Sequence, residues 1–133
     1  MAQNPTQTIM RSTLGRARGL GTAKSGTAHW WAERMTSVAL VPLTLWFVLA
    51  IYRLAGVTAA EVAHWAASPV NATLLLALIV VTFHHMALGL QVVIEDYIHS
   101  DMTRLVSIMA MKAVTGLLAL AGIIAVLKLA IIG

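Results

Sequence analysis

The sequence of 133 residues contains no cysteine and only five acidic residues, against nine lysines and arginines. The absence of cysteine excludes a disulfide framework, a cysteine-ligated iron–sulfur cluster and a thiolate zinc site. Charged residues make up 11% of the chain and hydrophobic residues 59%, and the mean hydropathy is +0.85. This balance is typical of an integral membrane protein, and the chain is too short for more than a handful of spans.

Long apolar runs account for most of the chain after the first thirty residues. We predict helices over about 34–53, 72–94 and 105–130, and therefore an all-α integral membrane fold with three transmembrane helices. The second run measures about 34 Å as a helix, which is enough to cross a bilayer. Pro42 is expected to kink the first span because proline removes a helix hydrogen bond. A short helix on the surface is expected within 57–65.

The residues before the first span are polar and basic. Residues 1–28 carry no acid and four cations, Arg11, Arg16, Arg18 and Lys24. We interpret this segment as a solvated tail, with docking on a partner subunit as the alternative, and residues 29–133 as the membrane domain. Lysine and arginine are enriched on the cytoplasmic side of membrane proteins, so the tail is predicted to be cytoplasmic, or on the matrix side in mitochondria. The formal charge of +4 therefore reports orientation and not nucleic-acid binding.

Two adjacent histidines, His84 and His85, lie deep in the second apolar run. An ionisable residue at membrane depth is costly unless it has a partner, which marks a candidate functional site. At 100° per residue, His85 shares a helix face with Gly89, Val92 and Asp96 to within about 40°, whereas His84 points about 100° away. A flat cofactor can lie against a face where glycine provides no side chain. The alternative is a buried histidine that hydrogen-bonds a neighbouring helix.

The pattern His-x-x-x-Gly-x-x-x-Val-x-x-Asp-Tyr, read from His85 to Tyr97, resembles the small hydrophobic membrane anchor subunits of succinate dehydrogenase. The resemblance implies that His85 is an axial ligand of haem b iron and that Tyr97, with Asp96 beside it, binds ubiquinone. It also implies that Arg34, and less closely His29, meet a haem propionate. An interfacial anchor is the ordinary alternative for Tyr97, and a positive-inside anchor is the alternative for Arg34.

The resemblance also implies partners, because a bis-histidine haem needs a second ligand. That ligand would come from a cytochrome b-like anchor subunit, whose Ser-x-x-His-Arg stretch is absent here. An iron–sulfur subunit and a flavoprotein subunit would complete the complex, and this chain alone would catalyse nothing. His84 is expected to make a hydrogen bond to a neighbouring helix or a contact behind the ligand, although a shifted register would make His84 the ligand.

The implied function is to anchor a succinate:ubiquinone oxidoreductase in a bacterial inner membrane, with a mitochondrial inner membrane as the less favoured location. The anchor of a quinol:fumarate reductase is a close alternative, because reaction direction depends on potentials that the sequence does not encode. A small proton-conducting or transport subunit is the alternative from another class, with a relay through His84, His85 and Glu95. A structural assembly subunit without any site is the third.

Overall fold

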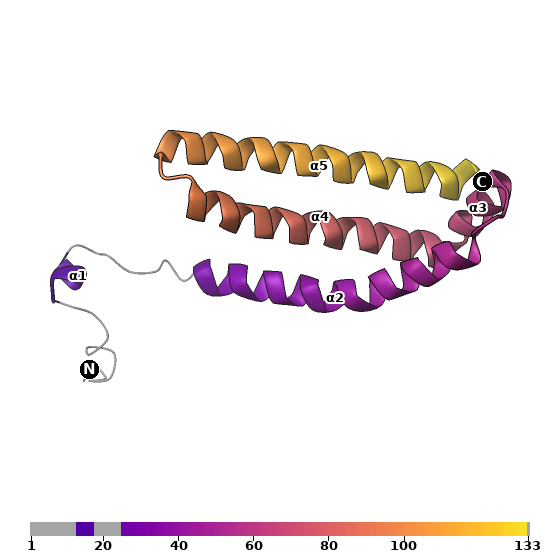
Figure 1. The fold of residues 1–133 in the computed structure, drawn as a ribbon, viewed down its shortest axis with the longest axis horizontal. Helices are drawn as coiled ribbons and strands as arrows, with labels where there is room; N and C mark the ends of the chain where they lie inside the picture. The colour runs from indigo at the N-terminus through magenta and orange to yellow at the C-terminus, as the bar shows by residue number, and fades with distance from the viewer. Residues whose placement is uncertain (1–12, 18–24, 133) are drawn as a thin grey trace. The chain divides into compact units, whose positions relative to one another are not determined.

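The computed structural model describes residues 13–17 and 25–132, all of whose regular elements are helices (Figure 1). The helices are α1 (Thr13–Ala17), α2 (Ser25–Arg53), α3 (Ala59–Ala67), α4 (Pro69–Tyr97) and α5 (Asp101–Ile132). The chain divides into two units, Met1–Trp30 and Trp31–Gly133. Of the basic residues assigned to the tail, Arg16 lies in α1, whereas Arg11, Arg18 and Lys24 lie outside the described residues. The predicted all-α class is confirmed.

Three helices, α2, α4 and α5, are long and apolar enough to cross a membrane, which confirms the predicted number of spans among the described residues. They contain 29, 29 and 32 residues. A rise of about 1.5 Å per residue makes each helix longer than the hydrocarbon core, which is about 30 Å thick. The helices therefore extend past the predicted bounds, because hydropathy marks only the apolar part of a helix whose backbone hydrogen bonds continue beyond it.

Helix caps build the corner between α2 and α4. Thr58 and Glu61 form a capping box at the start of α3: the amide of Thr58 donates to Glu61 Oε2 at 2.7 Å, and the amide of Glu61 donates to Thr58 Oγ1 at 3.3 Å. Ser68 ends α3 and caps α4, whose first residue is Pro69, a position where the missing amide hydrogen costs nothing. This chemistry explains the short helix expected within 57–65, which the structure confirms as α3.

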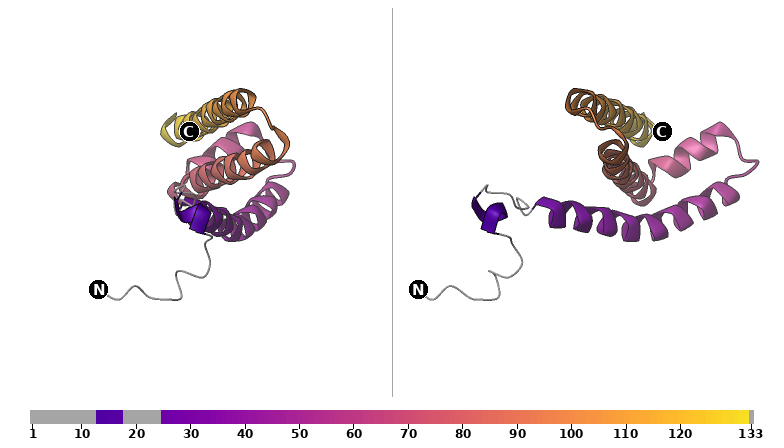
Figure 2. Two further views of the ribbon diagram at one scale, coloured as in Figure 1. Left: turned by 90° about the vertical axis from the view of Figure 1, so that its left-hand side faces the viewer. Right: turned by 60° about the vertical axis from the view of Figure 1, so that its left-hand side comes forward.

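Within the second unit, α4 packs along α5 and α3 contacts both (Figures 1 and 2). A Cβ atom on Gly122 of α5 would lie 3.3 Å from Ile79 Cδ1 of α4, so glycine allows close packing of the two helices here. At Gly116, on the same helix, a Cβ atom would meet nothing within 4 Å. The second unit's part of α2 reaches α3 through Trp46 and Trp65, whose rings stack with centroids 5.8 Å apart.

Pro42 lies inside α2 without ending it. The helix runs continuously past the proline and bends along its length in the views of Figures 1 and 2. The loss of one backbone hydrogen bond is therefore absorbed by bending.

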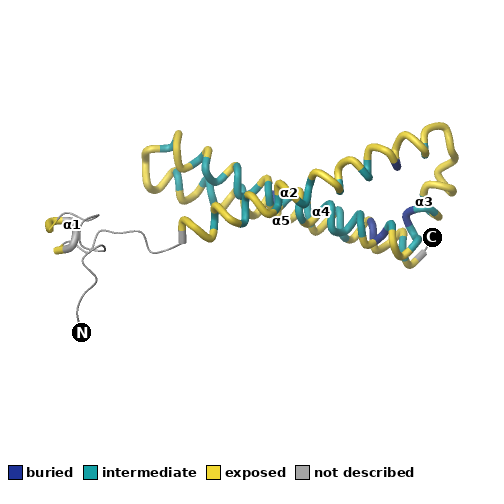
Figure 3. Tube along the Cα trace, turned by 90° about the horizontal axis from the view of Figure 1, so that it is seen from below, coloured by how far each residue is buried: buried dark blue, intermediate teal, exposed yellow. Residues whose placement is uncertain are grey.

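Few side chains in the described residues are buried (Figure 3). The buried residues are small or of medium size: Ala50, Ala66, Ala72, Thr115 and Val126. Many large apolar side chains of the spans are exposed instead, especially on α2 and α5. In a membrane, such side chains face lipid or other helices, so the chain presents broad apolar surfaces to its surroundings.

Candidate functional site

The centre of the candidate site is His85, half-buried in the middle of α4. Its Nδ1 atom lies 2.9 Å from the hydroxyl oxygen of Thr36 on α2, and this hydrogen bond joins residues 49 positions apart. The Thr36 hydroxyl also lies 2.8 Å from the carbonyl oxygen of Ala32 and 2.9 Å from that of Glu33, within its own helix. His85 therefore does contact a neighbouring helix, through the ring nitrogen closer to its backbone.

The contacts of Thr36 favour one tautomer of the His85 ring. A hydroxyl has one hydrogen to donate, and carbonyl oxygens only accept. The Thr36 hydrogen is therefore directed to Ala32 and Glu33, and the contact to His85 is a hydrogen bond only if Nδ1–H donates. In the neutral ring this leaves Nε2 with a bare lone pair, which is the state that binds a metal ion.

Gly89 lies one turn after His85 on the same face of α4. A Cβ atom built on Gly89 would meet nothing within 4 Å. The space beside His85 is therefore open for a flat group, as the sequence predicts. No group of three or more His, Cys, Asp or Glu side chains that could hold a metal ion occurs within residues 13–17 and 25–132.

His84 faces a different part of the molecule. Its side chain is exposed and lines a groove of about 470 Å³ between α4 and α5, together with Lys112, Gln91 and Thr115. The separation of the two histidines, predicted from the helix geometry, is thus observed. The expected hydrogen bond from His84 to a neighbouring helix is not made within the described residues; His85 makes such a bond instead, because its side of α4 faces α2.

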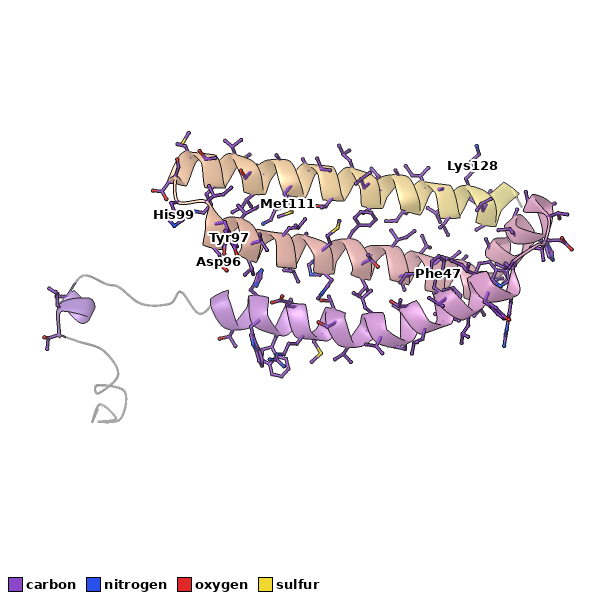
Figure 4. All side chains as sticks on the ribbon, in the orientation of Figure 1. Phe47, Asp96, Tyr97, His99, Met111 and Lys128 are labelled. Atoms are coloured by element: carbon purple, nitrogen blue, oxygen red, sulfur yellow. The ribbon has the colours of Figure 1, made fainter. Side chains whose placement is uncertain are left out.

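Asp96 and Tyr97 occupy the last turn of α4, beyond the predicted end of the span at about residue 94 (Figure 4). The amide of Ile98 still donates to the Ile94 carbonyl oxygen at 3.0 Å, so the helical hydrogen bonds continue past both residues. The Tyr97 side chain is 79% exposed. Asp96 lies eleven positions beyond His85, or about 16 Å along the helix. The phenol and the carboxylate are thus available to a ligand or a partner at this end of α4.

Arg34 and His29 both lie in the early turns of α2, which begins nine residues before the predicted start of the span. Arg34 is exposed and belongs to the second unit. His29 belongs to the first unit and is half-buried. Its Nε2 atom is buried and has no hydrogen-bond partner among the described residues.

Two contacts of this region were not predicted. Thr36 was not identified as a partner of His85, and Trp65 was not identified as the ring that stacks on Trp46. The only signal for Thr36 in the sequence is a polar residue inside the first span. Such residues often bond within their own helix, as Thr115 does to the Met111 carbonyl oxygen at 2.9 Å.

Comparison with known proteins identifies the family. Residues 8–121 match the succinate dehydrogenase/fumarate reductase transmembrane subunit family. The chain belongs to this family. A succinate dehydrogenase hydrophobic membrane anchor subunit from Rickettsia bellii is 36% identical over 118 residues, which cover 87% of this chain and 93% of the relative. One from Paracoccus denitrificans is 32% identical over 61% of this chain and 63% of the relative. No solved structure matches the chain.

These relatives support a membrane anchor subunit of succinate dehydrogenase, and the three apolar helices make it a multi-pass membrane protein. A further relative, from Reclinomonas americana, is a succinate dehydrogenase membrane anchor subunit and is 28% identical over 68% of this chain and 78% of the relative. The family match extends from the tail to the middle of α5, far beyond the short motif between His85 and Tyr97.

Proposed function

We propose that this anchor holds a succinate:ubiquinone oxidoreductase in the membrane, provides one axial ligand to a shared haem b through His85, and forms part of the ubiquinone site through Tyr97 and Asp96. The observation that carries the proposal is the hydrogen bond between His85 Nδ1 and Thr36. In the tautomer that donates from Nδ1 to Thr36, Nε2 has a bare lone pair in the middle of a membrane span, where an imidazole nitrogen with no ligand would be an unsatisfied polar group.

The residues around His85 fit a haem. Imidazole nitrogen is a common axial ligand, and the open face at Gly89 leaves room for a flat macrocycle. When bound, the haem supplies one-electron redox chemistry. The role of His85 is to hold the iron, and the role of Gly89 is to leave the adjacent turn free of side chain.

We assign Arg34 and His29 to the haem propionates, by resemblance to the family. A guanidinium group suits a carboxylate because its donors match both oxygens. The buried Nε2 of His29, which has no partner among the described residues, is the kind of atom that a further ligand would satisfy.

Tyr97 and Asp96 form this chain's share of the quinone site in our proposal. A phenol donates one hydrogen bond, and a bond to a quinone carbonyl oxygen strengthens as negative charge grows there during reduction. Asp96, which precedes Tyr97 on the same turn, supplies a carboxylate that can orient a basic group or accept and pass on a proton. Both side chains are exposed, as this role requires.

The remaining subunits follow from the function. A cytochrome b-like anchor would supply the second axial ligand, and an iron–sulfur subunit and a flavoprotein subunit would oxidise succinate and deliver electrons. The broad exposed apolar surfaces of α2 and α5 suit another membrane subunit as well as lipid. The tail is proposed to face the cytoplasm of a bacterial inner membrane, which places Tyr97 on the same side.

Substitution of the two adjacent histidines tests the proposal. His85→Ala should abolish or shift the low-spin haem signal in a reduced-minus-oxidised spectrum of the purified complex, whereas His84→Ala should leave most of it. His84 is the matched control, because it is the neighbouring residue of the same type but faces the groove between α4 and α5. Gly89→Leu should act like His85→Ala by filling the open face. An unchanged spectrum in the His85 variant would overturn the assignment.

One alternative keeps support from the comparisons. The family includes fumarate reductase subunits, so an anchor of a quinol:fumarate reductase would use the same residues in the opposite direction. A proton relay through His84, His85 and Glu95 has less support. The two histidines face different elements, and Glu95 accepts a hydrogen bond of 2.8 Å from Gln91 on its own helix.

A further inference from the structure

Thr36 is the only hydrogen-bond partner that the structure gives to His85 among the described residues. It lies in the part of α2 that belongs to the second unit, three helical turns after Ser25. Its side chain is half-buried, so water competes less for the hydroxyl than at an exposed position. The bond links the ring of His85 to a different span, and its geometry is within the normal range for a hydrogen bond.

We propose that Thr36 is a positioning residue for the haem ligand: its hydroxyl accepts the Nδ1–H of His85, fixes the ring with Nε2 directed away from α2, and makes that nitrogen a stronger donor to iron. The inference rests on the proposed haem ligation by His85. A metal-ligating histidine is generally held by a hydrogen bond from its other ring nitrogen, and the acceptor raises the electron-donating power of the ligand.

The orientation of the Thr36 hydroxyl is itself held in place. Two carbonyl oxygens, of Ala32 and Glu33, lie within 2.9 Å and share its hydrogen. The oxygen's lone pairs are thereby left to His85. A hydroxyl that already donates to other acceptors becomes a better acceptor, because successive hydrogen bonds polarise one another. The Thr36 side chain thus connects the α2 backbone at Ala32 and Glu33 to the ring of His85.

The hydrogen bond from His85 to Thr36 should affect the midpoint potential of the haem. A neutral hydroxyl is a weaker acceptor than a carboxylate, so it supports the imidazole without turning it into an imidazolate. Stronger donation from Nε2 favours ferric over ferrous iron, and removal of the acceptor should therefore raise the midpoint potential. The same loss should let the ring rotate and weaken haem retention.

The chain provides a matched control in the next residue. Ser37 also donates its hydroxyl to the Glu33 carbonyl oxygen, at 2.6 Å, but it is exposed and is not hydrogen-bonded to His85, whose partner is Thr36. Ser37→Ala removes a hydroxyl from the same turn and the same carbonyl. If a Thr36 variant differs from wild type and Ser37→Ala does not, the difference comes from the lost bond to His85. It does not come from a lost bond within α2.

The test uses the whole purified complex with Thr36→Val, Thr36→Ala, Thr36→Ser and Ser37→Ala. The measurements are the haem midpoint potential, the ferric low-spin electron paramagnetic resonance signal, and the rate of haem transfer to apomyoglobin. The variants without a hydroxyl at position 36 should show a raised haem midpoint potential and a changed ferric low-spin signal. They should also transfer haem to apomyoglobin faster, which corresponds to a haem affinity lower by about 10- to 100-fold. Thr36→Ser and Ser37→Ala should match wild type. Alanine is included with valine so that a problem of shape in one variant does not decide the outcome.

The outcomes separate the two proposals. If the haem depends on His85 but the valine and alanine variants match wild type, Thr36 has no positioning role and the haem assignment stands. If Thr36→Ser changes as much as Thr36→Val, the effect comes from packing, and the inference is overturned. If the complex contains no haem, or contains haem that does not depend on His85, both the inference and the proposed ligation fail.

Discussion

His84 and His85 are one step apart on α4, and that step of about 100° gives them different neighbours. His85 meets Thr36 on α2, whereas His84 lines the groove beside α5. The two histidines have the same side chain, and only their positions on α4 give them different surroundings. Any experiment that treats the pair as a unit, such as a double substitution, would lose this information, whereas single substitutions retain it.

At the other end of α4, Tyr97→Phe tests the quinone proposal at the scale of one oxygen atom. The ring and its 79% exposure are kept, and only the hydroxyl is removed. The loss of a hydrogen bond that strengthens on reduction should cost about 1–3 kcal/mol, which corresponds to roughly 10- to 100-fold in quinone reduction rate. Succinate oxidation with an artificial acceptor that takes electrons before the quinone should not change, and neither should the haem spectrum.

The two assays of the Tyr97 variant distinguish its possible roles. A parallel fall in both activities would mean that the residue is structural, because the artificial acceptor does not need the quinone site. No fall in either would place the quinone site in the partner subunits and leave this chain with anchoring and haem ligation.

Residue-level prediction from the sequence succeeded where one helix carried the whole pattern. The shared face of His85 and Gly89 follows from helix geometry, and the structure shows the expected open space there. The bond from Thr36 to His85 was not predictable in this way, because it joins residues 49 positions apart on two helices. Periodicity gives the face of each helix, but the rotation and depth at which two helices meet depend on tertiary packing.

At the scale of helices, α4 and α5 meet at Gly122, and this contact predicts a difference between two glycines. Gly122→Leu should push against Ile79, whose Cδ1 atom would lie 3.3 Å from the new Cβ, and overpacking of this kind costs about 1–3 kcal/mol. Gly116→Leu is the matched control on the same helix, because nothing lies within 4 Å of its Cβ position. Thermal inactivation of the purified complex should occur at a lower temperature for the first variant only. Equal losses would show that the contact with Ile79 does not set the cost.

The capping box of α3 predicts a pH dependence. The amide of Thr58, and then its hydroxyl, hydrogen-bond the Glu61 carboxylate and hold the pKa of that group below its ordinary value of 4.5. A lowered pKa in the folded state stabilises the helix above the ordinary pKa, and this contribution is lost as pH falls below 4.5 through the lowered value. Amide exchange across residues 59–67, corrected for the intrinsic rate, should therefore increase over this range.

Glu61→Gln is the control for the capping box. Glutamine keeps an acceptor for the Thr58 amide but has no proton to gain, so exchange in this variant should not depend on pH in the same window. If the variant keeps the full pH dependence, another group is responsible.

The same scale shows why the span boundaries could only be approximated. The apolar run of α4 predicts a helix over about 72–94, yet Ser68 and Pro69 begin the helix earlier and Tyr97 ends it. The capping signals were present in the sequence, but hydropathy alone does not include them. The extension places Asp96 and Tyr97 on a helical turn and not in the following loop.

For the whole molecule, the three spans and the basic tail predict on which side of the membrane each loop lies. Because the chain contains no cysteine, this topology can be tested with single introduced cysteines. Single cysteines at Thr13 in the tail, Ala60 in α3 and Ser100 between α4 and α5 can be labelled with a membrane-impermeant maleimide in inverted and right-side-out vesicles. One span separates Thr13 from Ala60, and two separate Thr13 from Ser100. Positive residues remain on the cytoplasmic side, so Thr13→Cys and Ser100→Cys should react in inverted vesicles and Ala60→Cys in right-side-out ones.

The labelling also bears on the proposed quinone site, because Ser100 lies three residues after Tyr97. If Ser100→Cys reacts from the cytoplasm, Tyr97 lies on the side where a soluble iron–sulfur subunit would dock, and electrons need not cross the membrane to reach quinone there. Opposite sides for Thr13 and Ser100 would overturn the three-span topology. The same side for both, but facing the periplasm, would keep the three spans and remove Tyr97 from the path of electrons that arrive from the cytoplasm.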